Sequence, residues 1–127
     1  MQNKTLVATA APENRRGVGF IKSRKSDGRI MDVAEMMIAM SEKRGIRIEE
    51  VVVDQSSGLD IDRRSVDRLV SFMERDDIDT LVVHDIFDLS ENVDDLMAFL
   101  IRARALDVNV LSMKYGFRAA SLPWYGR

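Results

Sequence analysis

Short strand-like runs alternate with amphipathic stretches along most of this chain. Four runs are rich in β-branched or apolar residues, at residues 18–22, 47–53, 80–83 and 108–113. Three stretches between them carry apolar residues at helical spacing, at residues 30–44, 64–75 and 92–105. The run TLVV is β-branched or apolar throughout, as is typical of a strand at the centre of a parallel sheet. We therefore predict an α/β fold of three layers, with a mainly parallel four-stranded sheet flanked by helices.

The predicted domain covers residues 17–113, between an N-terminal arm of residues 1–16 and a C-terminal tail of residues 114–127. Apolar residues make up 46% of the chain and charged residues 31%, which is ordinary for a globular protein. The absence of cysteine and of any long apolar run favours a cytoplasmic protein with no membrane segment. The net charge of −2 argues against a dedicated nucleic-acid binder, because such proteins use an excess of Lys and Arg to displace counterions from phosphates.

The predicted topology indicates where a binding site would lie. In open parallel sheets, ligands bind outside the carboxyl ends of the strands, where the winding direction of the chain reverses. The loops that follow the first three predicted strands are therefore the candidates, at residues 22–29, 54–64 and 84–91. Ser26, Asp27 and Gly28 within the first loop are more typical of a turn and a helix N-cap than of a phosphate cradle.

The same loops carry motifs that resemble those of the catalytic domain of resolvase/invertase-type serine recombinases. Residues 54–58 (DQSSG) and 62–63 (DR) match the second-loop pattern Asp-x-x-Ser-Gly and Asp-Arg. Residues 19–24 (GFIKSR) stand where that family has aromatic-x-Arg-x-Ser. Residues 84–91 (HDIFDLSE) stand where the family has Asp-Arg-Leu-x-Arg. The resemblance covers residues 17–113 and implies a resolvase catalytic-domain-like fold.

The resemblance also implies an activity, DNA strand exchange through a phosphoserine intermediate, with neither a metal nor another cofactor. In the family, arginines hold the phosphate, because a bidentate guanidinium matches its developing charge. Aligned without gaps, the nucleophile position holds Arg24 and the neighbouring arginine position holds Lys22. Two further arginine positions hold Asp88 and Glu91, which repel a phosphate. We therefore expect the chain to be catalytically degenerate.

A few residues remain that a phosphate-binding site could use. The family-like remnants are Lys22, Ser57 and Arg63, and the hydroxyls nearest to the nucleophile position are those of Ser23 and Ser26. An anion patch could form from the basic residues of the first two loops, Lys22, Arg24, Lys25, Arg63 and Arg64. A solvated rim, partly neutralised by nearby acids, is the alternative explanation for that cluster.

The third loop offers the side chains most suited to a cation, namely His84, Asp85, Asp88 and Glu91. Carboxylates so placed suit Mg²⁺, but acids also favour the N-terminus of a helix for electrostatic reasons. The second explanation is the commoner one, so we predict no metal site and no cofactor.

Three functions are compatible with these observations. The chain could be a recombinase-like protein, a non-catalytic interaction or regulatory module on the resolvase fold, or a binder of a small phosphorylated ligand. We expect a homodimer, since residues 117–125 (FRAASLPWY) are apolar enough to cover exposed surface within the chain or across a two-fold axis, with Trp124 at or near the contact. An intact recombinase is a further candidate partner, and DNA binding should be weak and nonspecific.

Overall fold

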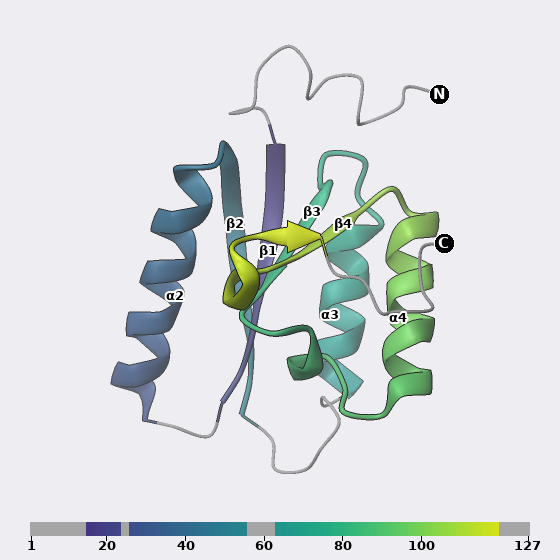
Figure 1. Cartoon of the computed structure of the whole chain (residues 1–127), viewed down its shortest axis with the longest axis horizontal. Coiled ribbons are helices and arrows are strands. Elements are labelled where there is room, and N and C mark those ends of the chain that lie inside the picture. The colour runs from purple at the N-terminus through teal and green to yellow at the C-terminus, as the bar shows by residue number, and fades with distance from the viewer. Residues whose placement is uncertain (1–14, 24–25, 56–62, 120–127) are drawn as a thin grey trace.

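The computed structural model describes residues 15–23, 26–55 and 63–119. Its centre is a five-stranded sheet in the order β2-β1-β3-β4-β5 (Figure 1). The strands are β1 (Arg15–Lys22), β2 (Ile46–Asp54), β3 (Thr80–Val83), β4 (Asn109–Ser112) and β5 (Arg118–Ala119). The first four are mutually parallel, as predicted, and only β5 runs antiparallel, beside β4.

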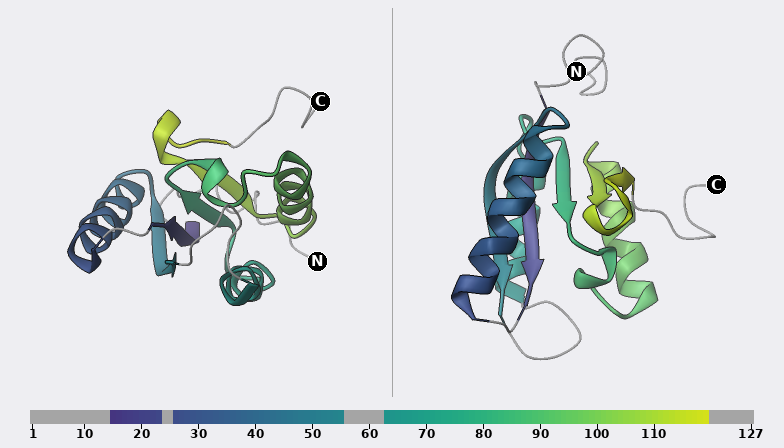
Figure 2. Two further views of the ribbon diagram at one scale, coloured as in Figure 1. Left: turned by 90° about the horizontal axis from the view of Figure 1, so that it is seen from below. Right: turned by 60° about the vertical axis from the view of Figure 1, so that its left-hand side comes forward.

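Helices cover both faces of this sheet and give the predicted three layers (Figure 2). They are α2 (Asp27–Glu42), α3 (Arg63–Met73) and α4 (Val93–Ala105), with short 3-10 helices η2 (Ile86–Asp88) and η3 (Met113–Tyr115). Helix α2 packs on one face over β1 and β2, whereas α3 and α4 pack on the other. In the described part of the chain, no helix is long and apolar enough to span a bilayer.

The three helices agree with the predicted ones except at their ends. Helix α2 starts three residues before the predicted start at Ile30, because the Ser26 side chain caps it by accepting a hydrogen bond from the Arg29 backbone N–H. Asn92 caps α4 in the same way through the backbone N–H of Asp95. Gly45, just after α2, has a φ of 75°, the left-handed conformation in which many helices end.

Two cores form on the two faces of the sheet, because successive side chains of a strand point to opposite sides. On the α3 and α4 face, Val18 and Phe20 of β1 pack with Leu81 of β3 and with apolar residues of both helices. On the α2 face, Ile21 of β1 packs with Met37 of α2 and with further apolar residues, Ile46, Val82, Leu111 and Phe117.

The fifth strand lies in the predicted C-terminal tail, and Arg15 and Arg16 of the predicted arm belong to β1. Gly116 and Phe117 lead into β5 with positive φ angles of 71° and 64°. A side chain in this region of backbone space costs about 1–2 kcal/mol. Phe117 is nevertheless buried in the core on the α2 face, and the Arg44 guanidinium lies 4.4 Å from its ring centre. These contacts offset the backbone strain and fix the turn into β5.

Candidate functional site

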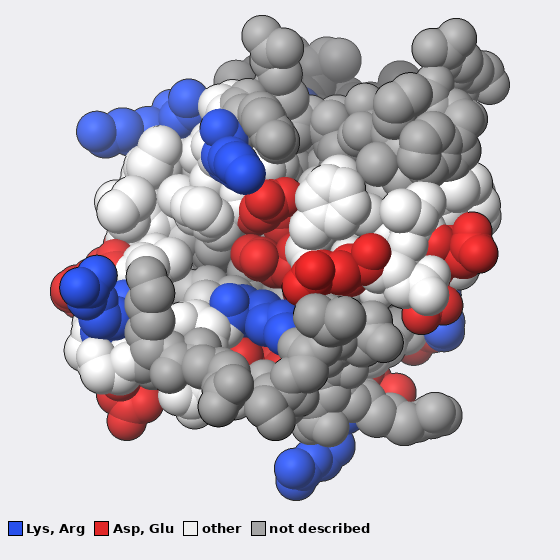
Figure 3. Space-filling model, turned by 60° about the horizontal axis from the view of Figure 1, so that its bottom comes forward, with Lys and Arg blue, Asp and Glu red and all other residues white. Residues whose placement is uncertain are grey.

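The candidate site lies at the carboxyl edge of the parallel strands. The chain passes from β1 to β2 on one side and then returns to β3 on the other side of β1. That reversal makes the ends of β1 and β3 the switch point of the sheet. The described parts of the three predicted loops meet at this edge, and Figure 3, which looks obliquely onto it, shows acidic side chains gathered near its middle with basic ones around them.

Lys22 lies at the end of β1, where it forms an ion pair with Asp54 of β2. The Lys22 Nζ is 3.7 Å from Asp54 Oδ2, and the exposed fractions of the two side chains are 14% and 2%. The two residues are register partners in the parallel β1–β2 pair, which places them side by side at the edge of the sheet. Lys22 is thus a described basic residue at the switch point, and the negative charge of Asp54 offsets its positive charge.

The third loop folds into η2, which is held together by two carboxylates. Asp85 Oδ1 accepts a hydrogen bond from the Phe87 backbone N–H at 3.1 Å, and Asp88 Oδ2 accepts one from the Asp85 backbone N–H at 3.4 Å. This reciprocal arrangement is a capping box. Lys114 Nζ donates to Asp85 Oδ2 at 3.2 Å, so this second basic side chain is also paired with an acid.

The environment of Asp88 disfavours negative charge. Burial raises the pKa of the Asp88 carboxyl above its ordinary value, the hydrogen bond from Asp85 opposes that rise, and the charge of Asp85 adds to it. His84 and Lys114 lower the pKa by smaller amounts. A phosphate brought to this side of the edge would add another negative charge beside a carboxyl group that is already harder to ionise than usual.

The two candidate hydroxyls have different surroundings. Ser23 follows β1, and its backbone N–H donates to the Asp54 carbonyl at 3.1 Å, which continues the β1–β2 ladder by one residue. Ser26 is the N-cap of α2, which confirms the predicted turn and cap at this position. The cap role engages the Ser26 hydroxyl oxygen as an acceptor.

The remaining candidate residues lie largely outside the described structure. Arg24, Lys25 and Ser57 are not among the described residues. Arg63 is the first residue of α3, but only its backbone is described, and Arg64 is an exposed residue of the same helix. The anion patch expected from these basic residues therefore stays a prediction.

Three further residues contribute to this edge: Asp54, Ser112 and Lys114. In the sequence Asp54 stands out only as part of the DQSSG motif. It does, however, end the strand next to that of Lys22 and carries the opposite charge, which favours an ion pair between them. Lys114 was assigned to the tail, yet its backbone N–H donates to the His84 carbonyl and its side chain reaches Asp85. The Ser112 hydroxyl also donates to the His84 carbonyl, at 3.1 Å. No sequence pattern predicts the contacts of Lys114 and Ser112, since they depend on the packing of β3 beside β4.

The acidic side chains of the third loop do not converge as metal ligands. Within residues 15–23, 26–55 and 63–119, no group of three or more His, Asp or Glu side chains is arranged to hold a metal ion. Asp85 and Asp88 instead engage backbone N–H groups of their own loop. The helix-entrance explanation of these acids therefore accounts for their contacts.

Comparisons with known proteins agree with this architecture. Residues 23–121 match the family model described as "Resolvase, N terminal domain". The N-terminal catalytic domain of TP901-1 integrase is similar in structure, with a TM-score of 0.66 and 20% sequence identity over 86% of this chain and 84% of that one. A resolvase family site-specific recombinase from Streptococcus pneumoniae has a TM-score of 0.67 and 15% identity, over 87% of this chain and 78% of that one. No curated protein matches the chain.

Proposed function

The chain belongs to the resolvase N-terminal domain family, and we propose that it acts as a non-catalytic interaction module on that fold. In this proposal the chain keeps the sheet and helices of the family but does not cleave DNA. Its working form is a homodimer, and an intact recombinase is a second possible partner. DNA, if bound at all, is bound weakly and without sequence preference.

The observation that carries this proposal is the charge arrangement at the carboxyl edge. Asp85 and Asp88 occupy the third loop, where phosphate binding would require attraction. Among the described residues, Lys22 and Lys114 are the basic side chains at the ends of β1 and β4, and each is paired with an acid. Each acid that stands in place of a base weakens the binding free energy of a nearby phosphate by on the order of a kcal/mol or more at short range.

The alignment of the family motifs supports the same conclusion. It puts Arg24 at the position of the nucleophile and acids at two arginine positions, Asp88 and Glu91. When several groups act together in one transition state, the effects of removing them on the rate are not additive. Losing any one of them typically lowers the rate by several orders of magnitude. The rate of DNA cleavage should therefore fall below detection.

A cleavage assay tests the proposal directly. The protein is incubated with supercoiled plasmids that carry recombination sites, the reaction is stopped with detergent, and protein–DNA adducts are sought by electrophoresis and by mass spectrometry. An intact family member with its own site is the positive control. We expect neither nicked plasmid nor a covalent adduct, and a phosphoserine link at Ser23, Ser26 or Ser57 would show that the chain is a recombinase after all.

A DNA titration tests the binding part of the proposal. With a net charge of −2, the protein should bind duplex DNA with a Kd no tighter than about 10⁻⁵ M at physiological salt, the nonspecific range. Fluorescence anisotropy with a labelled duplex measures this. Nanomolar, sequence-selective binding would contradict it.

A further inference from the structure

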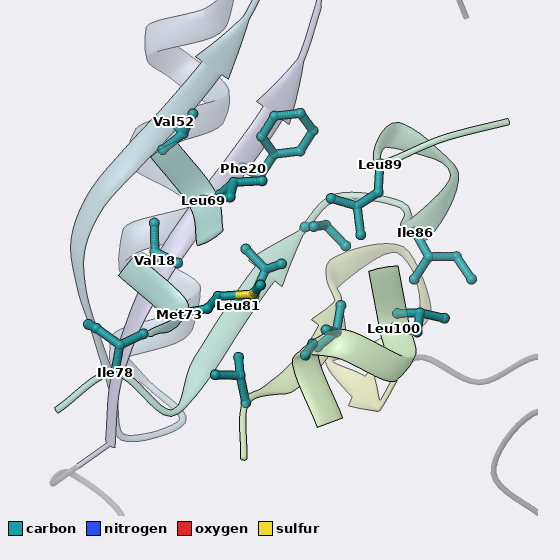
Figure 4. Close-up of a cluster of buried hydrophobic side chains, with 14 of the residues drawn as sticks. Val18, Phe20, Val52, Leu69, Met73, Ile78, Leu81, Ile86, Leu89 and Leu100 are labelled. Atoms are coloured by element: carbon teal, nitrogen blue, oxygen red, sulfur yellow. The ribbon is translucent and has the colours of Figure 1, made fainter. Parts of the chain in front are cut away.

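One flank of α4 carries apolar side chains that are exposed or only half-buried. Leu96, Leu100 and Ala103 of this helix are buried against the sheet, and Figure 4 shows Leu100 on the side of α4 that faces the core. Val93 and Ile101 are instead 39% and 52% exposed. They recur every four residues with Met97, which is half-buried and also packs against the core, so the three form one stripe along the helix.

The direction of this stripe follows from the contacts of the helix. Arg102 of α4 forms an ion pair with Glu74, which directly follows α3, so that side of α4 faces α3. At about 100° per residue, Met97 lies well away from Arg102 around the helix axis. Helix α3 contacts β1 and β2, whereas α4 contacts β4. The stripe therefore lies on the β5 side of α4, beyond β4 in the strand order.

The chain leaves the described structure on this same side. Strand β5 ends at Ala119, which is paired with Leu111 of β4. Because β5 is antiparallel to β4, it runs from the carboxyl edge toward the amino edge, in the direction that α4 also takes. The residues that follow, 120–127 (ASLPWYGR), contain Leu122, Trp124 and Tyr125.

The length of this segment is compatible with a contact to the stripe. Trp124 is the fifth residue after Ala119, and five extended residues span at most about 17 Å. A helix with its side chains is about 10–12 Å wide, so this length is compatible with a contact between Trp124 and the flank of α4. By sequence, Pro123 disfavours a helical conformation at the residue before it, Leu122.

We propose that Leu122–Tyr125 docks on the Val93–Met97–Ile101 stripe of α4 in its own chain. The short linker keeps the segment close to this flank, so docking within the chain needs no second copy. The segment and the stripe together then form one apolar surface beside β5. This inference concerns the surface of α4 and stands whether or not the chain cleaves DNA.

Trp124 is the only tryptophan of the chain, so its fluorescence reports on the segment directly. We compare the wild type with Ile101→Glu and with Met36→Glu, a matched control on α2, since Met36 is also 52% exposed. Emission maxima and acrylamide quenching are measured at concentrations where analytical ultracentrifugation finds monomer. Circular dichroism checks that each variant is folded.

The proposal expects a shielded, blue-shifted Trp124 in the wild type and in Met36→Glu. It expects a red shift and a larger quenching constant in Ile101→Glu, because a charge on the stripe expels the indole ring. Three results would overturn it: a wild-type Trp124 as accessible as free tryptophan, an Ile101→Glu spectrum equal to that of the control, or shielding that appears only at dimer-forming concentrations. The last result would assign the segment to a second copy.

Discussion

The ion pair between Lys22 and Asp54 gives the sharpest quantitative prediction. Two unit charges 3.7 Å apart attract by about 4–5 kcal/mol at an effective dielectric constant near 20. Desolvation of both groups cancels much of that gain, so the pair itself contributes little to the free energy of unfolding. Removing one partner is different, because the other charge stays in its buried position. We expect Lys22→Met to lower the free energy of unfolding by about 3–5 kcal/mol.

Urea unfolding of Lys22→Met, Asp54→Asn and the double variant measures this as a double-mutant cycle. The double variant should be more stable than the sum of the single effects predicts, with a coupling energy above about 1 kcal/mol. Lys114→Met is the matched control: its pair with Asp85 is shorter, at 3.2 Å, but the Lys114 side chain is 51% exposed. Its effect should stay below about 1 kcal/mol because solvent screens the pair. Additive single effects would refute the reasoning, and so would equal losses in Lys22→Met and Lys114→Met.

Three further predictions concern pH, packing and assembly. Because burial raises the pKa of Asp88 in the folded protein, the fold is more stable when this carboxyl is protonated. The free energy of unfolding of the wild type, relative to that of Asp88→Asn, should therefore rise as the pH falls from neutrality toward about 4. Urea-unfolding experiments that give parallel pH profiles for the two proteins would contradict this. Gly19→Ala should cost about 1–3 kcal/mol, because its new Cβ would lie 2.5 Å from the Sδ of buried Met37. Gly28→Ala, in the first turn of α2 with nothing within 4 Å, should instead gain about 0.5–1 kcal/mol, and thermal melts that rank the two variants otherwise would refute the packing argument. In analytical ultracentrifugation the wild type should be a dimer that Trp124→Ala weakens, and a wild type that stays monomeric at high concentration rules the homodimer out.

The parallel sheet was predictable because its strands and helices carry strong, separate periodicities. Residues 80–83 are all β-branched or apolar and coincide with β3, which is buried throughout. Helix ends were harder to place, since α2 begins at a capping contact of Ser26 and not at the first apolar residue. Strand β5 could not be predicted from its two residues, because it depends on the positive φ of Phe117 and on the cover that Arg44 provides.

The candidate site was predictable in position but not in its contacts. The three loops were found from topology and motif, which fix the edge of the sheet at which they meet. The pairing of Lys22 with Asp54 depends on the register of β1 against β2, which includes an irregularity between Gly17 and Val18. A shift of register by one residue would move Asp54 away from Lys22, and no local sequence signal specifies that register.

The acid at position 88 has a structural role in the third loop. Asp88 accepts the Asp85 backbone N–H while Asp85 accepts that of Phe87, so the two carboxylates together fix η2. An arginine at position 88 has no acceptor and could not close this box. The carboxylate of Asp88, which would repel a phosphate, is therefore also one of the two groups that hold the loop. Asp88→Arg would remove the acceptor of the Asp85 backbone N–H, so we expect this substitution to loosen η2 and not to create a phosphate site by itself.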